Sequence, residues 1–109
     1  MTRDATESDQ PMFGWMTVRR IKPGMMEAFR ERWYIGPEAA TTDPYSGIPR
    51  VYFMQDTADP NRMIGLGIFT GREAFDHWIS SEVEADRRFE MDQFVETVEE
   101  ESTFWVSEY

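Results

Sequence analysis

The amino-acid sequence predicts an α+β domain of the ferredoxin-like type, with the element order β-α-β-β-α-β. Three observations support this fold. Four segments have the composition and alternation of strands, the segments between them carry apolar residues at helical spacing, and Pro and Gly separate the two kinds of segment. The 109 residues suffice for one domain, which we expect to span residues 12–109 after a polar, flexible tail at residues 1–11.

The first predicted strand covers residues 12–21, where apolar and β-branched residues are frequent. Alternation along a strand divides its side chains between two faces. One face carries Phe13, Trp15, Thr17, Arg19 and Ile21, and the other carries Met12, Gly14, Met16, Val18 and Arg20. The two arginines end the strand, and we expect them to reach solvent.

A helix and a long loop follow this strand. Pro23-Gly24 ends the strand, and Met26, Phe29 and Trp33 then recur at helical spacing. Gly and Pro are dense over residues 36–49, which predicts little regular structure there. So long a loop in a small domain is often a lid over a site.

The middle of the chain predicts a β-hairpin. Residues 50–56 and 62–69 have the composition of strands, and the turn Asp59-Pro60-Asn61 joins them. Gly65 and Gly67 share one face of the second of these strands. Two glycines on one face leave a shallow gap that either a helix or a ligand must fill.

The last part of the chain predicts further helical segments and a final strand. Thr70-Gly71-Arg72-Glu73 fits a capping box at a helix start. A buried stripe follows at Ala74, Phe75, Trp78 and Ile79. A second helical pattern begins near Val83 and includes Met91, Phe94, Val95 and Val98. We expect the final strand at residues 102–108, so that Glu99-Glu100-Glu101 forms a solubilising surface run.

The composition excludes several classes of function. With no Cys and one His, the chain has no disulfide, no thiol nucleophile and no multi-histidine metal site. Its formal charge of −10 argues against nucleic acid or an anionic membrane as a partner. No stretch has the length and hydropathy of a membrane span, and the first residues lack the apolar run of a signal peptide. We therefore expect a cytoplasmic protein.

Both faces of the predicted sheet are apolar, although helices would cover only one. The chain has a single Leu, so its core must come from 8 Met, 8 Phe, 4 Trp and 4 Tyr. In the strands Met16 and Met54 alternate with Trp15 and Phe53. A second copy, packed sheet against sheet, is the expected cover in so short a chain, and we predict a homodimer.

The chain from Phe13 to Tyr109 resembles the dimeric α/β-barrel superfamily, and within it the antibiotic biosynthesis monooxygenase type of domain. Three segments carry the resemblance: Lys22-Pro23-Gly24, residues 56–62 and residues 69–78. The resemblance implies a ferredoxin-like domain that forms a dimeric barrel. Activity varies widely among proteins of this fold, so specific residues must be compared.

Two branches of this family share a Trp that Trp78 matches. In the heme-degrading branch, Thr17 and Arg88 occupy the positions of an Asn and of the iron-ligating His, and a guanidinium cannot ligate iron. The other branch oxidises anthrone-like phenols to quinones with O2 and no cofactor. Its Asn and Tyr are not matched here, because the one Asn, Asn61, lies in the hairpin turn. An aromatic interior without Cys suits that chemistry, so the resemblance favours it over heme degradation.

The candidate site lies between the helices and the sheet. We expect Trp78 to pack on the substrate, Thr17 to donate a hydrogen bond and Arg88 to stabilise the anion that forms. His77 is the first candidate base, because imidazole titrates nearest neutrality, although it lies off the apolar stripe. The expected substrate-binding residues are Trp15, Arg19, Phe53, Gly65, Gly67 and Phe75.

Each candidate also has a structural interpretation. Trp78 can be core packing, and Arg87 and Arg88 can form ion pairs on a helix surface. The interior distinguishes the two. A gap filled by Phe75, Trp78 and Phe94 indicates a structural domain, whereas an open cavity lined by Thr17, Arg19 or Arg88 indicates a ligand.

Two functions therefore stand against each other. The first is a monooxygenase without metal or organic cofactor that acts on a hydrophobic, phenolic or enolisable small molecule. The alternative is non-oxidative binding or cyclisation of such a molecule on the same scaffold.

Overall fold

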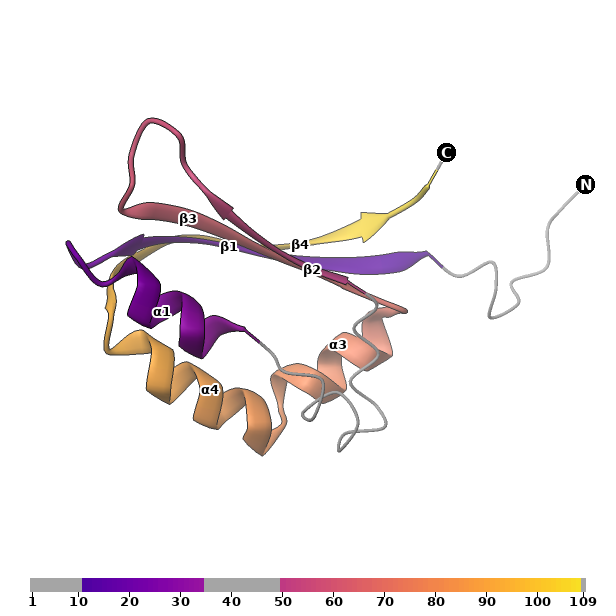
Figure 1. The fold of residues 1–109 in the computed structure, drawn as a ribbon. Helices are drawn as coiled ribbons and strands as arrows, with labels where there is room; N and C mark the ends of the chain where they lie inside the picture. Colours follow the sequence, from indigo (N-terminus) through magenta and orange to yellow (C-terminus); the bar gives the residue numbers. More distant parts are fainter. Residues whose placement is uncertain (1–10, 35–49, 109) are drawn as a thin grey trace, which may run out of the picture.

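In the computed structural model, residues 11–34 and 50–108 are described, and they form a four-stranded antiparallel sheet with all its helices on one face (Figure 1). The strand order is β2-β3-β1-β4. The elements are β1 (Met12–Ile21), α1 (Met26–Trp33), β2 (Arg50–Gln55), β3 (Arg62–Phe69), α3 (Arg72–Ile79), α4 (Glu82–Asp92) and β4 (Val95–Val106). This arrangement confirms the predicted ferredoxin-like fold. The tail predicted at residues 1–11 and the lid predicted at residues 36–49 fall, but for residue 11, outside the described residues.

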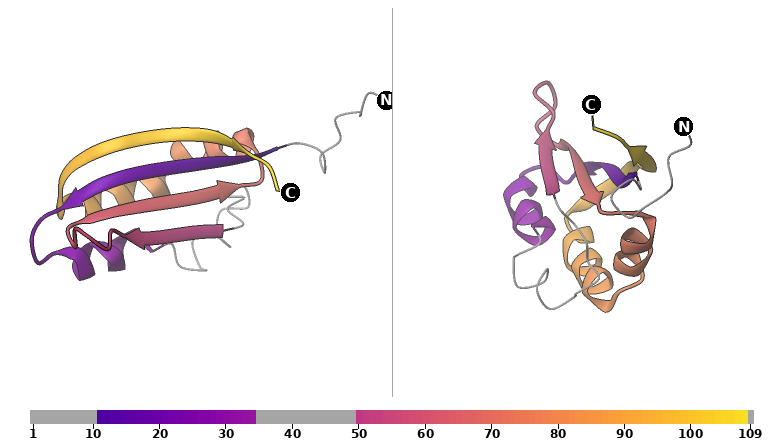
Figure 2. Two further views of the ribbon diagram at one scale, coloured as in Figure 1. Left: turned by 90° about the horizontal axis from the view of Figure 1, so that it is seen from above. Right: turned by 90° about the vertical axis from the view of Figure 1, so that its right-hand side faces the viewer.

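β1 lies inside the sheet and pairs with β3 on one side and β4 on the other, while β2 and β4 form the edges (Figure 2). In this register Trp15 lies opposite Gly67 of β3, and Thr17 lies between Gly65 of β3 and Glu101 of β4. On the helix-covered face, β3 thus has no side chain next to Trp15 or Thr17, because both of its residues there are glycines.

β4 corrects the predicted boundary between the last helix and the last strand. It begins at Val95, and α4 ends at Asp92, so the helical pattern does not continue to Val98. Two register shifts against β1 interrupt the alternation of β4, which hid the strand in the sequence. Glu101 consequently lies within a strand, opposite Thr17, and Glu99, Glu100 and Glu101 are exposed, as predicted.

The helix starts also differ from the predicted pattern. α3 begins after Gly71 without a side-chain cap, so the expected capping box at residues 70–73 does not form. The side-chain cap belongs to α4, where the Ser81 hydroxyl accepts a hydrogen bond from the Glu84 amide at 3.2 Å. The same hydroxyl donates to the Trp78 carbonyl at 2.7 Å. Ser81 therefore ties the end of α3 to the start of α4.

The buried core is divided into two clusters. The first comprises Ile21, Phe29, Trp33, Met63 and Met91. The second comprises Phe13, Trp15, Phe69 and Trp78. Between the residues that β1 gives to these clusters lie Thr17 and Arg19, which are 4% and 2% exposed. Because Arg19 is buried, the expectation that it reaches solvent is wrong.

The other face of the sheet has no helix over it (Figure 1). Tyr52, Met54 and Phe104 are exposed there, each by more than 40%. The end of this face near the β2–β3 turn is charged, because Arg20 pairs with Asp59 at 2.8 Å. Among the described residues, no helix is long and apolar enough to cross a membrane.

Candidate functional site

A small cavity opens between the helices and the sheet, where the two core clusters meet. It is narrow, with space inside for little more than ordered water. Its lining comprises Trp15, Thr17, Arg19, Trp33, Val51, Gly65, Leu66, Gly67, Phe69, Trp78 and Arg87. Six of these were predicted from the sequence: Trp15, Thr17, Arg19, Gly65, Gly67 and Trp78.

Two glycines form the sheet side of this cavity. A Cβ at Gly65 would lie 2.8 Å from Nε1 of Trp33, and one at Gly67 would lie 3.3 Å from the ring of Phe69. The predicted gap over the glycines is therefore filled in part by aromatic side chains. Any side chain at Gly65 would displace the Trp33 wall, so glycine is required there for a steric reason.

Arg19 brings a charge into the cavity. Its Nη1 donates to Oγ1 of Thr17 at 2.6 Å, and its guanidinium lies 5.7 Å from the ring centre of Phe29. Burial lowers the pKa of Arg19 to about 10, with further contributions from the nearby cations Arg87 and Arg88. Arg19 is thus still a cation at neutral pH. Among the described residues it has no salt-bridge partner, and its Nε has no hydrogen-bond partner.

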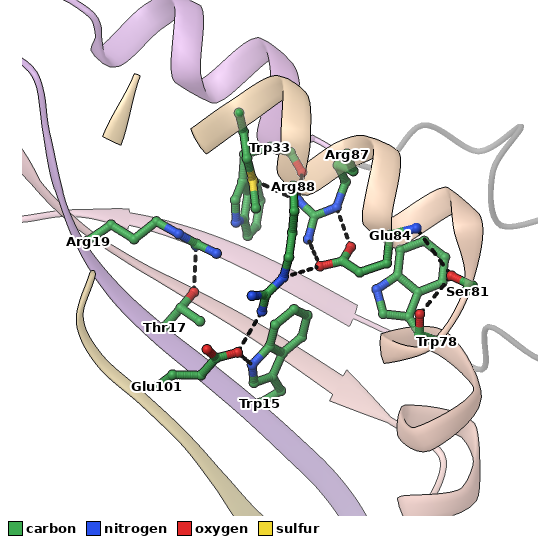
Figure 3. Close-up of polar contacts among 11 residues, drawn as sticks. Trp15, Thr17, Arg19, Trp33, Trp78, Ser81, Glu84, Arg87, Arg88 and Glu101 are labelled. Atoms are coloured by element: carbon green, nitrogen blue, oxygen red, sulfur yellow. Dashed lines mark hydrogen bonds and ion pairs between the residues drawn. The ribbon is translucent and has the colours of Figure 1, made fainter. Parts of the chain in front are cut away.

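Arg87 and Arg88 are, by contrast, fully paired (Figure 3). Arg87 Nε donates to Oε1 of Glu84 at 2.7 Å, and Arg87 Nη1 donates to the carbonyl of Trp33 at 2.7 Å. Arg88 donates to Glu84 at 3.1 Å and to Glu101 at 2.6 Å. Glu84 itself is 1% exposed. Arg87 and Arg88 therefore form ion pairs, which is the structural role that the sequence analysis allowed for them.

Glu101 joins this network to β1. Its Oε2 accepts hydrogen bonds from Trp15 Nε1 at 2.7 Å and from Arg88, whose guanidinium stacks 5.1 Å from the Trp15 ring centre. Burial acts to raise the pKa of Glu101, but the hydrogen bonds from Arg88 and Trp15 outweigh it and lower this pKa below its usual value. Glu101 is thus ionised at neutral pH, and Trp15 is held in place.

Charges of both signs lie around the cavity. Three guanidinium groups, those of Arg19, Arg87 and Arg88, lie near the carboxylates of Glu84, Asp92 and Glu101. Glu84 and Glu101 hydrogen-bond to α4 arginines, whereas Asp92 and Glu101 attract Arg19 only at longer range. Among the described residues, Arg19 is therefore the cation of this group without a directly paired carboxylate.

Trp78 supplies a second donor without a partner. Its side chain is fully buried and lines the cavity, yet its Nε1 has no acceptor within the described part of the chain. Figure 3 shows the Trp78 indole on the α3–α4 side of the site and the Arg19 guanidinium on the β1 side. Buried donors are nearly always paired, so two open donors lining one cavity indicate missing acceptors.

Four of the predicted site residues do not line the cavity. His77 is exposed on α3. Phe53 packs against Phe29 and Trp33 in the first cluster. Phe75 packs against Trp15 and Phe69 in the second. Arg88 packs behind Trp15, a lining residue, and forms ion pairs with Glu84 and Glu101.

The sequence reasoning missed five lining residues, Trp33, Val51, Leu66, Phe69 and Arg87, and it missed Glu84 and Glu101 as the partners of the α4 arginines. Ser81 and Glu84 have the spacing of a capping box, which marks the start of α4. Glu101 falls on the inner face when the alternation of the last strand is extended backward from Trp105. These signals were available. Within residues 11–34 and 50–108, no three acidic or His side chains gather where they could hold a metal ion.

The fold was compared with known proteins. No family model matches this sequence, and no curated protein matches it. Several solved structures share the fold, with TM-scores near 0.7. A protein of Caulobacter crescentus, provisionally named an antibiotic biosynthesis monooxygenase, has a TM-score of 0.75 at 12% identity, over 91% of this chain and 92% of its own.

Two further solved structures have the same fold. A provisionally named antibiotic biosynthesis monooxygenase of Nitrosomonas europaea has a TM-score of 0.74 at 16% identity, over 89% of this chain and 91% of its own. SnoaB of Streptomyces nogalater, a cofactor-independent oxygenase, has a TM-score of 0.70 at 13% identity, over 91% of this chain and 96% of its own. At these identities the likeness shows the fold, and it confirms the fold that the sequence resemblance implied.

Proposed function

We propose that this chain is a cofactor-independent monooxygenase that acts on a hydrophobic, phenolic or enolisable small molecule. One observation carries the proposal: a narrow, aromatic-walled cavity lined by Thr17 and Arg19, in which Arg19 has no directly paired carboxylate among the described residues. Such a cavity is the feature by which a ligand site differs from a packed core. The shared fold with SnoaB and related structures supports the reaction class.

The reaction converts an activated methylene of the substrate to a carbonyl. The substrate first loses a proton from that carbon and becomes a resonance-stabilised enolate or phenolate. Its electrons reduce O2, a peroxide forms at the carbon, and loss of water leaves the ketone. The sum is CH2 + O2 → C=O + H2O, in which the substrate carbon supplies all four electrons.

The cavity residues act on the anion in this sequence. Arg19, by its charge, lowers the pKa of a bound acid and stabilises the enolate or phenolate. Thr17 holds the Arg19 guanidinium in place through its hydroxyl. Trp15 and Trp78 flank a flat ring, and Trp78 Nε1 donates to an oxygen of the substrate. Because His77 does not line the cavity, the substrate proton passes to water.

The alternative, non-oxidative binding or cyclisation, has a specific observation in its favour. No carboxylate and no imidazole is among the described residues that line the cavity. A general base contributes much of the rate in many proton abstractions, so a cavity without one suits binding. The two functions differ in whether O2 is consumed.

The proposed assembly is a homodimer in the cytoplasm, packed through the helix-free face of the sheet. The exposed Tyr52, Met54 and Phe104 support this choice of face. An isologous contact would bury this apolar patch on both copies. Light scattering at micromolar concentration should give the mass of two chains, and the mass of one chain would contradict the dimer.

Oxygen consumption tests the function. Wild-type protein with a panel of anthrones, which carry the activated methylene, should consume one O2 per quinone formed. Trp78→Phe should lower kcat/KM about tenfold, because the ring remains but its N–H is lost. Trp105→Phe, which changes a tryptophan that is 61% exposed and outside the cavity, is the matched control and should match wild type. Binding of these compounds without O2 uptake would favour the alternative, and full activity of Trp78→Phe would remove Trp78 from the site.

A further inference from the structure

We infer that the cavity binds its ligand as an anion, through a negatively charged oxygen on a planar ring or enol, and that Arg19 takes this charge. The ligand class is therefore an ionised aromatic or enolic acid. The inference deepens the proposed function and rests on it for the choice of site. It differs from the sequence prediction, which assigned the anion to Arg88.

Arg19 is deeply buried. Its side chain is 2% exposed, and within the described residues its guanidinium donates one hydrogen bond, to the neutral hydroxyl of Thr17, and forms no salt bridge. A buried cation without a directly paired carboxylate is costly, and proteins seldom retain one unless a partner arrives. A guanidinium also presents a planar fork of donors that matches the two lone-pair directions of a carboxylate or an ionised enol system.

The neighbouring carboxylates do not pair directly with Arg19. Glu84 is bound by Arg87 and Arg88, at 2.7 and 3.1 Å, and Glu101 by Arg88 at 2.6 Å. Asp92 and Glu101 attract Arg19 at longer range, Arg87 and Arg88 repel it, and its pKa of about 10 keeps it protonated at neutral pH. A negatively charged ligand oxygen would therefore give the Arg19 guanidinium a direct ionic partner.

The cavity walls indicate the shape of the ligand. Four flat side chains surround the cavity, those of Trp15, Trp33, Phe69 and Trp78. On the sheet side, the β3 glycines contribute no side chain. Flat rings pack on such walls with favourable offset or edge contacts. Trp78 Nε1 is a second open donor, which fits a ligand with an oxygen at a second position.

The experiment compares an anion with its neutral isostere. Titration calorimetry of the full chain with 2-naphthoate and 2-naphthamide should show that the carboxylate binds at least about tenfold more tightly. Arg19→Met should abolish this preference, so that both compounds bind equally. Arg72→Met, which removes an arginine whose side chain is 65% exposed on α3, should keep the preference. Melting curves of the free proteins show that each variant is folded.

Arg19→Gln is a second variant, because its amide keeps a polar group beside the Thr17 hydroxyl while the charge is removed. It should also lose the preference for the carboxylate. Equal binding of the two compounds to wild type, or absence of binding of both at millimolar concentration, would overturn the inference. Retention of the preference in both Arg19 variants would overturn it as well.

A third probe, 2-naphthol, identifies the source of the negative oxygen. Calorimetry in two buffers of different ionisation enthalpy should show release of about one proton per 2-naphthol bound at neutral pH, because the cavity takes the phenolate. Binding without proton release would restrict the ligand class to carboxylic acids. If 2-naphthoate binds as expected and no anthrone consumes O2, the proposed oxygenase activity fails and the anion site stands. If O2 is consumed and the naphthoate preference is absent, the anion site fails alone.

Discussion

Two arginine environments lie side by side beneath the sheet, and they differ in burial and in pairing. Arg88 stacks on Trp15 and donates to two carboxylates, whereas Arg19 is more deeply buried and, within the described residues, its side chain donates to Thr17 alone. Paired charges fix the positions of elements, and a buried charge without a direct partner raises the free energy of the folded protein. We infer from this difference that the α4 network is structural and propose that the Arg19 site is kept, at a cost in stability, for a ligand.

The largest effect is expected at Glu84, where a neutral side chain would break the paired region. Glu84→Gln leaves Arg87 and Arg88 without their shared buried carboxylate, and loss of one partner of a buried ion pair is strongly destabilising. We expect the free energy of unfolding to fall by about 3 kcal/mol in urea titrations. Asp76→Asn is the control, because it neutralises an exposed acid paired with Arg72. Equal losses in the two variants would contradict the structural role of Glu84.

The second prediction is that substitution of Arg19 and of Arg88 changes the free energy of unfolding in opposite directions. Arg19→Met removes a buried charge without a counter-ion and should raise the free energy of unfolding by ~1–2 kcal/mol. Arg88→Met leaves Glu84 and Glu101 with fewer donors and should lower it by ~1–2 kcal/mol. Destabilisation by both substitutions would mean that Arg19 is a structural residue.

The Arg19 effect also depends on pH with a defined sign. The folded state holds the pKa of Arg19 near 10, below the usual value of an arginine, so above about pH 10 the unfolded state binds more protons than the folded state. The free energy of unfolding of the wild type therefore rises relative to that of Arg19→Met as pH rises above about 10. The gap between the two unfolding midpoints should narrow over this range and stay constant from pH 6 to about 9. A constant gap at all pH values would contradict the assigned charge.

A smaller effect is expected at the partly exposed Glu101. Its pKa is lowered in the folded state, so its contribution to stability is present above the unfolded value of 4.5 and is lost as pH falls below it. Glu101→Gln should cost about 0.5–1 kcal/mol at pH 7, and this cost should shrink as pH falls below 4.5 and through the lowered folded-state pKa. Urea titrations of both proteins across this range provide the measurement. A cost that does not change with pH would assign the effect to packing of Trp15.

The smallest effect is expected at Thr17. Thr17→Val keeps the shape of the side chain and removes the hydroxyl that positions Arg19 at 2.6 Å. We expect 2-naphthoate affinity to fall about threefold, with the preference over 2-naphthamide retained, because the charge remains. Loss of the whole preference would make Thr17 itself the anion ligand.

Much of this protein follows from local patterns in the chain. Pro23-Gly24, the hairpin turn and the alternation of β1 predict the element order, because each acts within a few residues. The same alternation places Trp15, Thr17 and Arg19 on one face, and the glycine spacing of β3 predicts a gap beside them. Six cavity residues could thus be named from the sequence.

The tertiary structure alone decided which charges are paired. Whether Arg19 or Arg88 meets a carboxylate depends on the register of β4, whose two irregularities interrupt the alternation between Val95 and Glu100 and leave Glu101 opposite Thr17. It depends equally on α4, which starts at Ser81 and thereby places Glu84 beneath the sheet. Ion pairing is set by distances between segments far apart in the chain, so the sequence shows the charges, and the fold shows which one is left without a partner.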